Sequence, residues 1–400
     1  MDGQKYLNAP AVITLITALS IIGPLSTDMY LPALSEIVAF FGTTEAFLNI
    51  TLYGFLFTQA LGVLFIGPVS DKFGRKYLLL GSIAVYIISS VLCAAAPDIF
   101  WFIVLRCIQG ISTGGLIVIA TALIKDCFRD IKVRGRVLTL TVFFGVVGPI
   151  AAPILGAWII HTINWQSTLI FPAFLMIVCI IGVLFLTEPL GKEERLTDSI
   201  SASLLRLPKL CKNRVFTLFL IAMGLPSMAL LCYVAISSYI FVDGFGISGT
   251  LYSFVLAGNA LLATLAMLVL QRFVASVKMR RYGLVLLVFT ILSGILLLLF
   301  GEAGPLACMF CIFPMCVGAF AARPYALGIL LQQYAGDTGS VSSLFNFTVM
   351  IFCCIGMFCG TLPWPTHIFG LGCMAVISGG LGVIVWALLR AGGMKLKGMD

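Results

Sequence analysis

The sequence predicts an all-α polytopic membrane protein with twelve transmembrane helices in two pseudo-symmetric six-helix bundles. Three observations support this fold class. The 400 residues are 61% hydrophobic and 10% charged, whereas a soluble domain carries about 25% charged residues. The apolar residues form runs long enough to cross a bilayer as helices, which takes about 20 residues. The charged residues fall mostly in short connections between these runs.

Twelve apolar runs follow one another along the chain. They cover roughly residues 10–34, 45–68, 77–96, 99–124, 136–160, 165–187, 215–241, 248–271, 282–300, 304–330, 340–361 and 365–389. Lipid offers no hydrogen-bond partners, so we expect each run to satisfy its backbone as a helix. The first run is too long for a signal-peptide core and no small-residue cleavage site follows it, so we expect it to be retained as a span.

The basic residues predict the orientation of the chain. Of the 24 Lys and Arg residues, 22 lie at the termini or in the even-numbered connections, and none in the odd-numbered ones. Cytoplasmic loops are rich in Lys and Arg, so both termini are expected in the cytoplasm. The basic excess is therefore a topology signal and does not indicate nucleic-acid binding.

The longest connection, residues 188–214, divides the chain in the middle. It separates an N-terminal bundle, residues 1–187, from a C-terminal bundle, residues 215–400, with a cytoplasmic linker between them. Two six-helix halves are typical of transporters that bind their substrate near the midplane between the halves.

Asp28 is the most unusual residue of the first run, and a proline stands on each side of it, Pro24 and Pro32. An ionisable group inside a span costs about 2.5–3.5 kcal/mol to insert, so it usually faces the bundle interior and has a function there. We expect a proton or substrate site. The alternative is that Asp28 pairs with a buried arginine to hold the bundle together.

Arg106 lies inside the fourth run. Counted along the helices, it is about 12 Å from the outer end of its span and Asp28 about 9 Å from the outer end of the first. The two charges are therefore expected at a similar depth. The alternative is that the Arg106 side chain extends to the outer surface.

The connection after the second run, residues 67–76, predicts a tight cytoplasmic turn. Gly74 permits a left-handed backbone there, and Asp71 is one acid among three bases. A lone acid in this place can cap a helix N-terminus, and the start of the eleventh run near Asp337 lies on the same membrane face. A plain basic turn explains the bases but not the acid and the glycines.

Small residues recur on one face of the fifth run at helical spacing: Gly145, Gly148, Ala152 and Gly156. Pro149 and Pro153 should bend this helix. A bent, smooth face suits an interface between halves that move against each other. A lipid-facing proline kink is the alternative.

Together these stretches resemble the major facilitator superfamily, and within it the twelve-helix drug:proton antiporters of the bicyclomycin/chloramphenicol-resistance (Bcr/CflA-type) subfamily. The similar segments are residues 28–34, the turn 67–76, Arg106 with Gln109-Gly110, residues 148–156 and residues 335–344. One departure is Ala152-Pro153, where many antiporters have two glycines. Another is Ser20, where some relatives carry a second acid, which leaves the proton stoichiometry open.

The resemblance implies alternating access, driven by the proton motive force without a cofactor, in a monomer of the bacterial cytoplasmic (inner) membrane. Asp28 would accept the proton and Arg106 would be its coupling partner. The conformational gates would involve Asp71, Gly74, Arg75, Gly148, Pro149, Pro153 and Gly156.

Several polar side chains inside the runs are candidates to line a substrate cavity, although Tyr and Asn also hold helices together. They are Tyr30, Tyr53, Gln59, Gln109, Tyr233, Tyr239, Asn259, Arg323 and Asn346. Arg323 matches none of the subfamily segments given above. It can contact an anionic or carbonyl-rich substrate, pair with a helix end, or extend to the surface.

The expected function is proton-coupled export of small, largely apolar drugs or metabolites, with a dedicated metabolite exporter or proton symporter as the alternative. An enzyme is not expected, because two isolated His residues and one deep carboxylate supply no nucleophile with its base. Cys308 and Cys311 have metal-site spacing but lie inside a span without a second pair, so no metal is expected.

Overall fold

The computed structural model describes residues 4, 6–128, 130–191, 193, 195, 210–274, 279–333 and 338–391. Within these residues, twelve helical segments are long and apolar enough to cross a membrane, and no strand occurs among them. The predicted all-α fold with twelve spans is confirmed.

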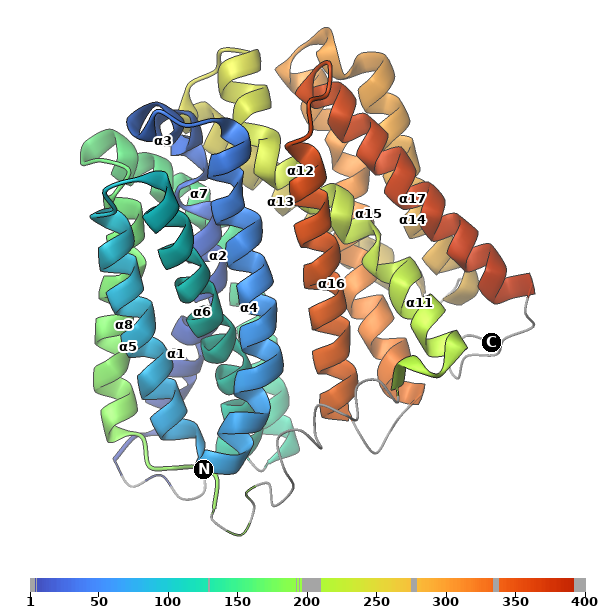
Figure 1. Cartoon of the computed structure of the whole chain (residues 1–400). Helices are drawn as coiled ribbons and strands as arrows, with labels where there is room; N and C mark the ends of the chain where they lie inside the picture. Colours follow the sequence, from blue (N-terminus) through green and yellow to red (C-terminus); the bar gives the residue numbers. More distant parts are fainter. Residues whose placement is uncertain are drawn as a thin grey trace. The chain divides into compact units, whose positions relative to one another are not determined.

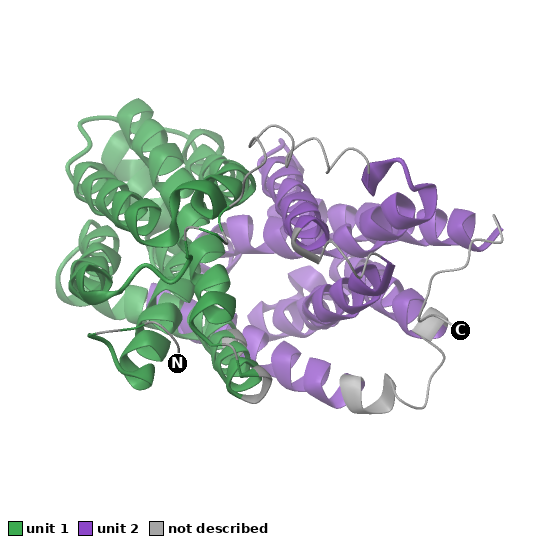
Figure 2. Ribbon diagram, turned by 90° about the horizontal axis from the view of Figure 1, so that it is seen from below, with its two compact units in different colours: residues 1–203 green, residues 204–400 purple. Residues whose placement is uncertain are grey.

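The first compact unit comprises residues 1–203, green in Figure 2. Its first span is broken into α1 (Ala9–Ser20), α2 (Ile22–Asp28), the 3-10 helix η1 (Leu31–Ala33) and α3 (Leu34–Phe41). The other five spans are α4 (Glu45–Phe73), α5 (Arg75–Ala94), α6 (Ile99–Cys127), α7 (Ile131–Thr162) and α8 (Ser167–Phe185), labelled in Figure 1. α6 packs against α4, α5 and α1, so it lies at the centre of this unit.

The second compact unit comprises residues 204–400, purple in Figure 2. Its first span consists of α11 (Arg214–Gly224), α12 (Pro226–Ser238) and the π-helix η3 (Tyr239–Gly244). The remaining elements are α13 (Gly249–Val274), α14 (Met279–Phe300), the 3-10 helix η4 (Gly301–Ala303), α15 (Pro305–Gln333), α16 (Thr338–Gly360) and α17 (His367–Ala391). Residues 196–209 of the predicted linker lie outside the described residues, so its bounds stay a prediction.

Short polar residues fix the starts of several helices. The side chain of Asn8 accepts the N–H of Ala11 at 3.0 Å, and that of Asp98 accepts the N–H of Trp101 at 2.9 Å. Such caps satisfy backbone donors that have no partner inside the helix. At these two helices, the polar residue directly before the apolar run therefore marks where the span begins.

Each unit holds its broken first span by the same contact. A Cβ added to Gly156 of α7 would lie 1.8 Å from the carbonyl oxygen of Met29, and one added to Gly356 of α16 would lie 2.0 Å from that of Met228. Only glycine permits such backbone approach. The two bundles are therefore similar in their packing, although the surrounding sequences differ.

Candidate functional site

Asp28 is the last residue of α2, close to the middle of the span that runs from Ala9 to Phe41. The span breaks between α1 and α2 at Ile21, and Pro24 in the first turn of α2 has no N–H to continue the earlier ladder. The Asp28 side chain is half-buried and accepts a hydrogen bond from the hydroxyl of Thr27 at 2.8 Å. The break therefore places a carboxylate with one hydrogen-bond partner deep inside a span.

Arg106 of α6 is completely buried. Its guanidinium donates to the side-chain oxygen of Gln109 at 2.5 Å, to the backbone carbonyl of Ser26 at 3.0 Å and to the hydroxyl of Tyr30 at 3.3 Å. It also lies over the rings of Tyr30 and Phe55, at 4.7 and 4.4 Å from their centroids. The alternative that Arg106 extends to the surface is therefore wrong.

A second set of polar groups surrounds the partners of Arg106. The Gln109 amide donates to the Ser90 hydroxyl. The hydroxyls of Ser26 and Tyr86 are 2.6 Å apart, and those of Tyr30 and Thr51 are 3.1 Å apart. Apart from the Nε of Arg106, which has no hydrogen-bond partner, these buried groups are paired, and such a network favours one conformation. It thus fixes the position of α2 against α4, α5 and α6.

Asp28 and Arg106 form no ion pair among the described residues. The two charges are connected through the backbone instead, because Arg106 holds the carbonyl of Ser26, two residues before the acid. Arg106 is thus committed to internal partners, and the Asp28 carboxylate is not neutralised by it. The alternative of a pair that only holds the bundle together does not describe this structure.

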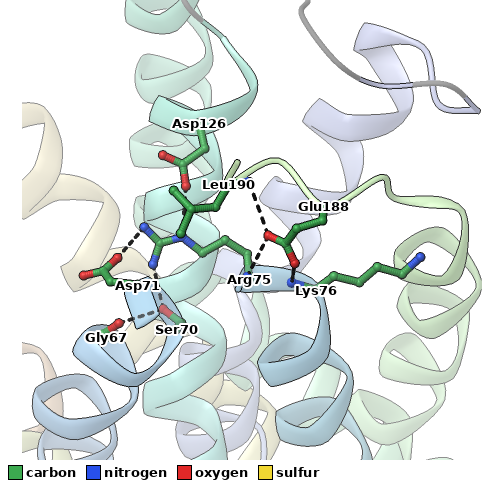
Figure 3. A network of polar contacts seen from close by, with 8 residues as sticks. All are labelled: Gly67, Ser70, Asp71, Arg75, Lys76, Asp126, Glu188 and Leu190. Carbon is green, nitrogen blue, oxygen red and sulfur yellow. Dashed lines mark hydrogen bonds and ion pairs between the residues drawn. The ribbon is translucent and has the colours of Figure 1, made fainter. Parts of the chain in front are cut away.

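The turn after α4 carries an ion-pair network, shown in Figure 3. The Arg75 guanidinium pairs with Asp71 at 2.5 Å and with Asp126 of α6 at 2.9 Å, and donates to the Ser70 hydroxyl at 2.6 Å. Gly74, between α4 and α5, has φ +104° and ψ 155°, a backbone conformation that essentially only glycine adopts. The expected tight turn is present, and its arginine joins α5 to both α4 and α6.

Glu188 completes this network and caps α5. Its carboxylate accepts the backbone N–H groups of Arg75 at 2.9 Å and Lys76 at 3.0 Å (Figure 3). The acid that caps α5 is therefore Glu188, whereas Asp71 pairs with Arg75. The helix start considered for Asp71, near Asp337, lies outside the described residues.

The small residues of α7 pack within unit 1. A Cβ on Gly148 would lie 3.1 Å from Pro24, and the close approach of Gly156 to Met29 was described above. Ala152 is buried in the same contact. At these positions the smooth face is thus covered by α2, which corrects the expected interface between halves. Gly145, by contrast, has no atom within 4 Å of an added Cβ. Pro149 and Pro153 lie inside this helix.

The predicted cavity residues fall into three groups. Tyr30 and Gln109 are buried partners of Arg106 and do not line an open surface in this structure. The side chains of Gln59, Tyr233, Tyr239 and Asn259 are also buried. Tyr53 and Asn346 are half-buried, and Arg323 is exposed.

Sequence reasoning missed several members of these networks. Ser26, Thr51, Tyr86 and Ser90 contact the Arg106 centre or its partners, and Asp126 and Glu188 bind the Arg75 turn. The only signals were hydroxyl groups inside apolar runs and acids at the ends of the fourth and sixth spans. No group of three or more His, Cys, Asp or Glu side chains suited to a metal occurs in the described part of the chain.

A family model described as Major Facilitator Superfamily matches residues 16–357. The chain belongs to the major facilitator superfamily. This superfamily and the relatives below are membrane transporters and not enzymes.

Three relatives narrow the family. The multidrug resistance protein MdtL of Klebsiella pneumoniae (strain 342) is 30% identical over 251 residues, which is 62% of each chain and so less than two thirds of MdtL. A bicyclomycin resistance protein homologue of Haemophilus influenzae is 24% identical over 402 residues, 95% of this chain and 96% of the relative. The uncharacterized MFS-type transporter YdgK of Bacillus subtilis is 27% identical over 352 residues, covering 85% and 86%. The resemblance to the Bcr/CflA-type drug transporters is confirmed.

Solved structures share the fold. The peptide transporter POT in complex with alafosfalin has a TM-score of 0.76, and the similarity covers 96% of both chains at 13% identity. At this identity the similarity concerns the fold alone.

Proposed function

We propose that this transporter exports small, largely apolar drugs or metabolites in exchange for protons, by alternating access. The observation that carries the proposal is the position of Asp28. Among the acids of the described spans it lies furthest from the span ends, and its carboxylate has one hydrogen bond and no cation. Such a group can take up and release a proton. Relatives named for multidrug and bicyclomycin resistance support export.

In the proposed cycle, Asp28 alternates between a protonated state and a state that allows substrate to bind. Proton and substrate each shift the inward–outward equilibrium only by their difference in affinity for the two states. Arg106 keeps the end of α2 in place through the Ser26 carbonyl while Asp28 changes charge. Inward movement of one charge supplies about 2.3 kcal/mol per 100 mV, which corresponds to roughly 50-fold accumulation.

We further propose that the chain works as a monomer in a bacterial cytoplasmic membrane, with both termini in the cytoplasm. The absence of Lys and Arg from the odd-numbered connections supports this orientation. The turn that carries Arg75 would then lie on the cytoplasmic side and act as part of the gate.

Proton flux in inside-out vesicles tests the proposal. With an acidified lumen, adding a substrate outside should release lumenal protons, because export into the lumen returns protons to the medium. Asp28→Asn should abolish this release while the protein still folds. The matched control is Glu36→Gln, which neutralises an exposed acid of α3 near the end of the same span, and it should leave the flux intact.

Two results would contradict the proposal. Undiminished resistance and proton release in Asp28→Asn would remove this residue from the mechanism. Proton uptake together with substrate entry would indicate a symporter of the same fold.

A further inference from the structure

Two arginines lie well inside described spans, and their surroundings differ. Arg106 in unit 1 is buried, and its two terminal nitrogens donate hydrogen bonds to Ser26, Tyr30 and Gln109. Arg323 in unit 2 is exposed, and its guanidinium has no hydrogen bond or ion pair with any described residue. The first arginine is committed to holding the fold, whereas the second is available to bind a ligand.

Arg323 lies well inside its span. At 1.5 Å per residue it lies about 27 Å from Pro305, where α15 starts, and about 15 Å from Gln333, where it ends. The apolar core of a bilayer is about 30 Å thick, and arginines that extend to the surface do so from positions near helix ends. Charged side chains inside spans face the bundle interior or a water-filled cavity, so we expect the exposed guanidinium to face water and not lipid.

No described acid of unit 2 is near enough to neutralise it. Glu302 directly precedes α15, and its carboxylate accepts a hydrogen bond from Thr366 at 3.0 Å. The neighbouring His367 stacks on Tyr239 of η3. Asp243 belongs to the same short helix, so it lies near Glu302. Both acids thus lie toward the start of α15, about 27 Å along the helix from the arginine.

The helix surface near Arg323 is open. Pro324 and Gly328 are exposed as well, and a Cβ on Gly328 would meet no atom within 4 Å. Pro324 has no N–H, so the carbonyl of Phe320 loses its usual partner in the helix. This stretch of α15 offers one fixed positive charge and room beside it.

We infer that Arg323 binds an oxyanion, such as a carboxylate, carried by an otherwise apolar transported molecule. A guanidinium presents paired N–H donors that match the two oxygens of such a group. This inference rests on the proposed export function and narrows its substrates to apolar organic anions. In this inference Arg323 makes the transporter selective for negatively charged substrates, and Asp28 carries the proton.

The first test asks whether the surface is open to water and selects for negative charge. Leu327 is one helical turn after Arg323, and the thiol of a Leu327→Cys variant can be modified with an anionic and with a cationic methanethiosulfonate. Native cysteines are accounted for with the unsubstituted protein. Relative to the cationic reagent, the anionic one should react at least about 5-fold faster when Arg323 is present than in Arg323→Gln. Two results would overturn the inference: labelling of Leu327→Cys no faster than background, or the same ratio of anionic to cationic labelling rates with Arg323 and with Arg323→Gln.

The second test compares two ligands that differ in charge. Binding of chloramphenicol and of its anionic hemisuccinate ester is measured on purified protein, without a proton gradient. Arg323→Gln should weaken binding of the ester about 10-fold or more, as expected for a charge-assisted hydrogen bond, and change binding of the neutral parent less than about 2-fold. Arg214→Gln, which removes an exposed arginine at the start of α11, should change neither.

Equal loss of both ligands, an unchanged affinity for the ester, or no binding of the ester by the unsubstituted protein would overturn the inference. These outcomes are independent of the Asp28→Asn experiment. Charge selection at Arg323 with normal proton release by Asp28→Asn would refute the coupling mechanism and retain the anion site.

Discussion

The carboxylate of Glu188 accepts the backbone N–H of Arg75 at 2.9 Å, across a sequence separation of 113 residues. One acid beyond the sixth span therefore caps the third span, and the same arginine reaches the fourth span through Asp126. The third span, the fourth span and the segment after the sixth span are thus tied together at one turn (Figure 3).

Removing the cap should destabilise unit 1. Glu188→Ala leaves the first two N–H groups of α5 without an acceptor and should lower the free energy of unfolding by about 1 kcal/mol, and Glu188→Gln by less. Thermal unfolding in detergent measures the change. The control is Glu193→Ala, an exposed acid in the same connection. Equal stabilities of the two alanine variants would contradict the capping role.

The two acids that bind Arg75 should differ in their effects. The side chains of Arg75 and Asp126 are 9% and 10% exposed, whereas that of Asp71 is 45% exposed. Ion pairs in solvent are worth up to about 1 kcal/mol, and breaking a buried pair costs roughly 3–5 kcal/mol. We expect Asp126→Asn to lower stability more than Asp71→Asn.

Transport distinguishes the roles of these acids further. If Asp71 belongs to the gate, Asp71→Asn should slow substrate export several-fold at nearly unchanged stability. An Asp71→Asn variant less stable than Asp126→Asn would show that burial does not decide the energy of this network.

Arg106→Lys should lose transport although the charge is kept. A lysine ammonium cannot reach the Ser26 carbonyl, the Tyr30 hydroxyl and the Gln109 amide together, and it lacks the planar group that lies over two rings. We expect at least about a 10-fold lower export rate in reconstituted vesicles. Full activity of this variant would mean that charge alone, and not the fixed position of α2, is what Arg106 supplies.

Two glycines of α7 provide a matched pair. Gly156→Ala forces a methyl group into the Met29 carbonyl and should cost about 1–3 kcal/mol, the usual range for overpacking. Gly145→Ala, on the same helix with no atom within 4 Å, should not lower stability. Thermal unfolding of both variants checks this. Helix propensity alone favours alanine at both positions, so equal losses would mean that the contact with Met29 does not set the cost.

The sequence was sufficient to predict the number and order of the spans, because the length of an apolar run and the charge of a loop are local properties of the sequence. It also indicated Asp28 and Arg106, because charges inside spans are rare, and the Arg75 turn, because an acid and glycines stand among its bases. The partners were less visible. Ser26 acts through its backbone carbonyl, and a carbonyl carries no signature in the sequence.

Contacts between residues that are far apart in the sequence could not be predicted either. Nothing local distinguishes Glu188 from other acids of the central connection, and its role depends on a helix that starts 113 residues earlier. The same holds for the small face of α7. Its residues were recognisable at Gly148 and Gly156, but the surface that covers them, Pro24 and Met29, is fixed only by the packing of α2.

The contacts of Gly156 with Met29 and of Gly356 with Met228 also limit how each bundle can deform. Backbone rests on backbone there, with no side chain between to change rotamer and allow sliding. The first and fifth spans of one unit, and the corresponding pair of the other, should therefore travel as rigid couples during the transport cycle. Bending and shear are left to the remaining helices, where distance measurements with spin labels would find the largest changes.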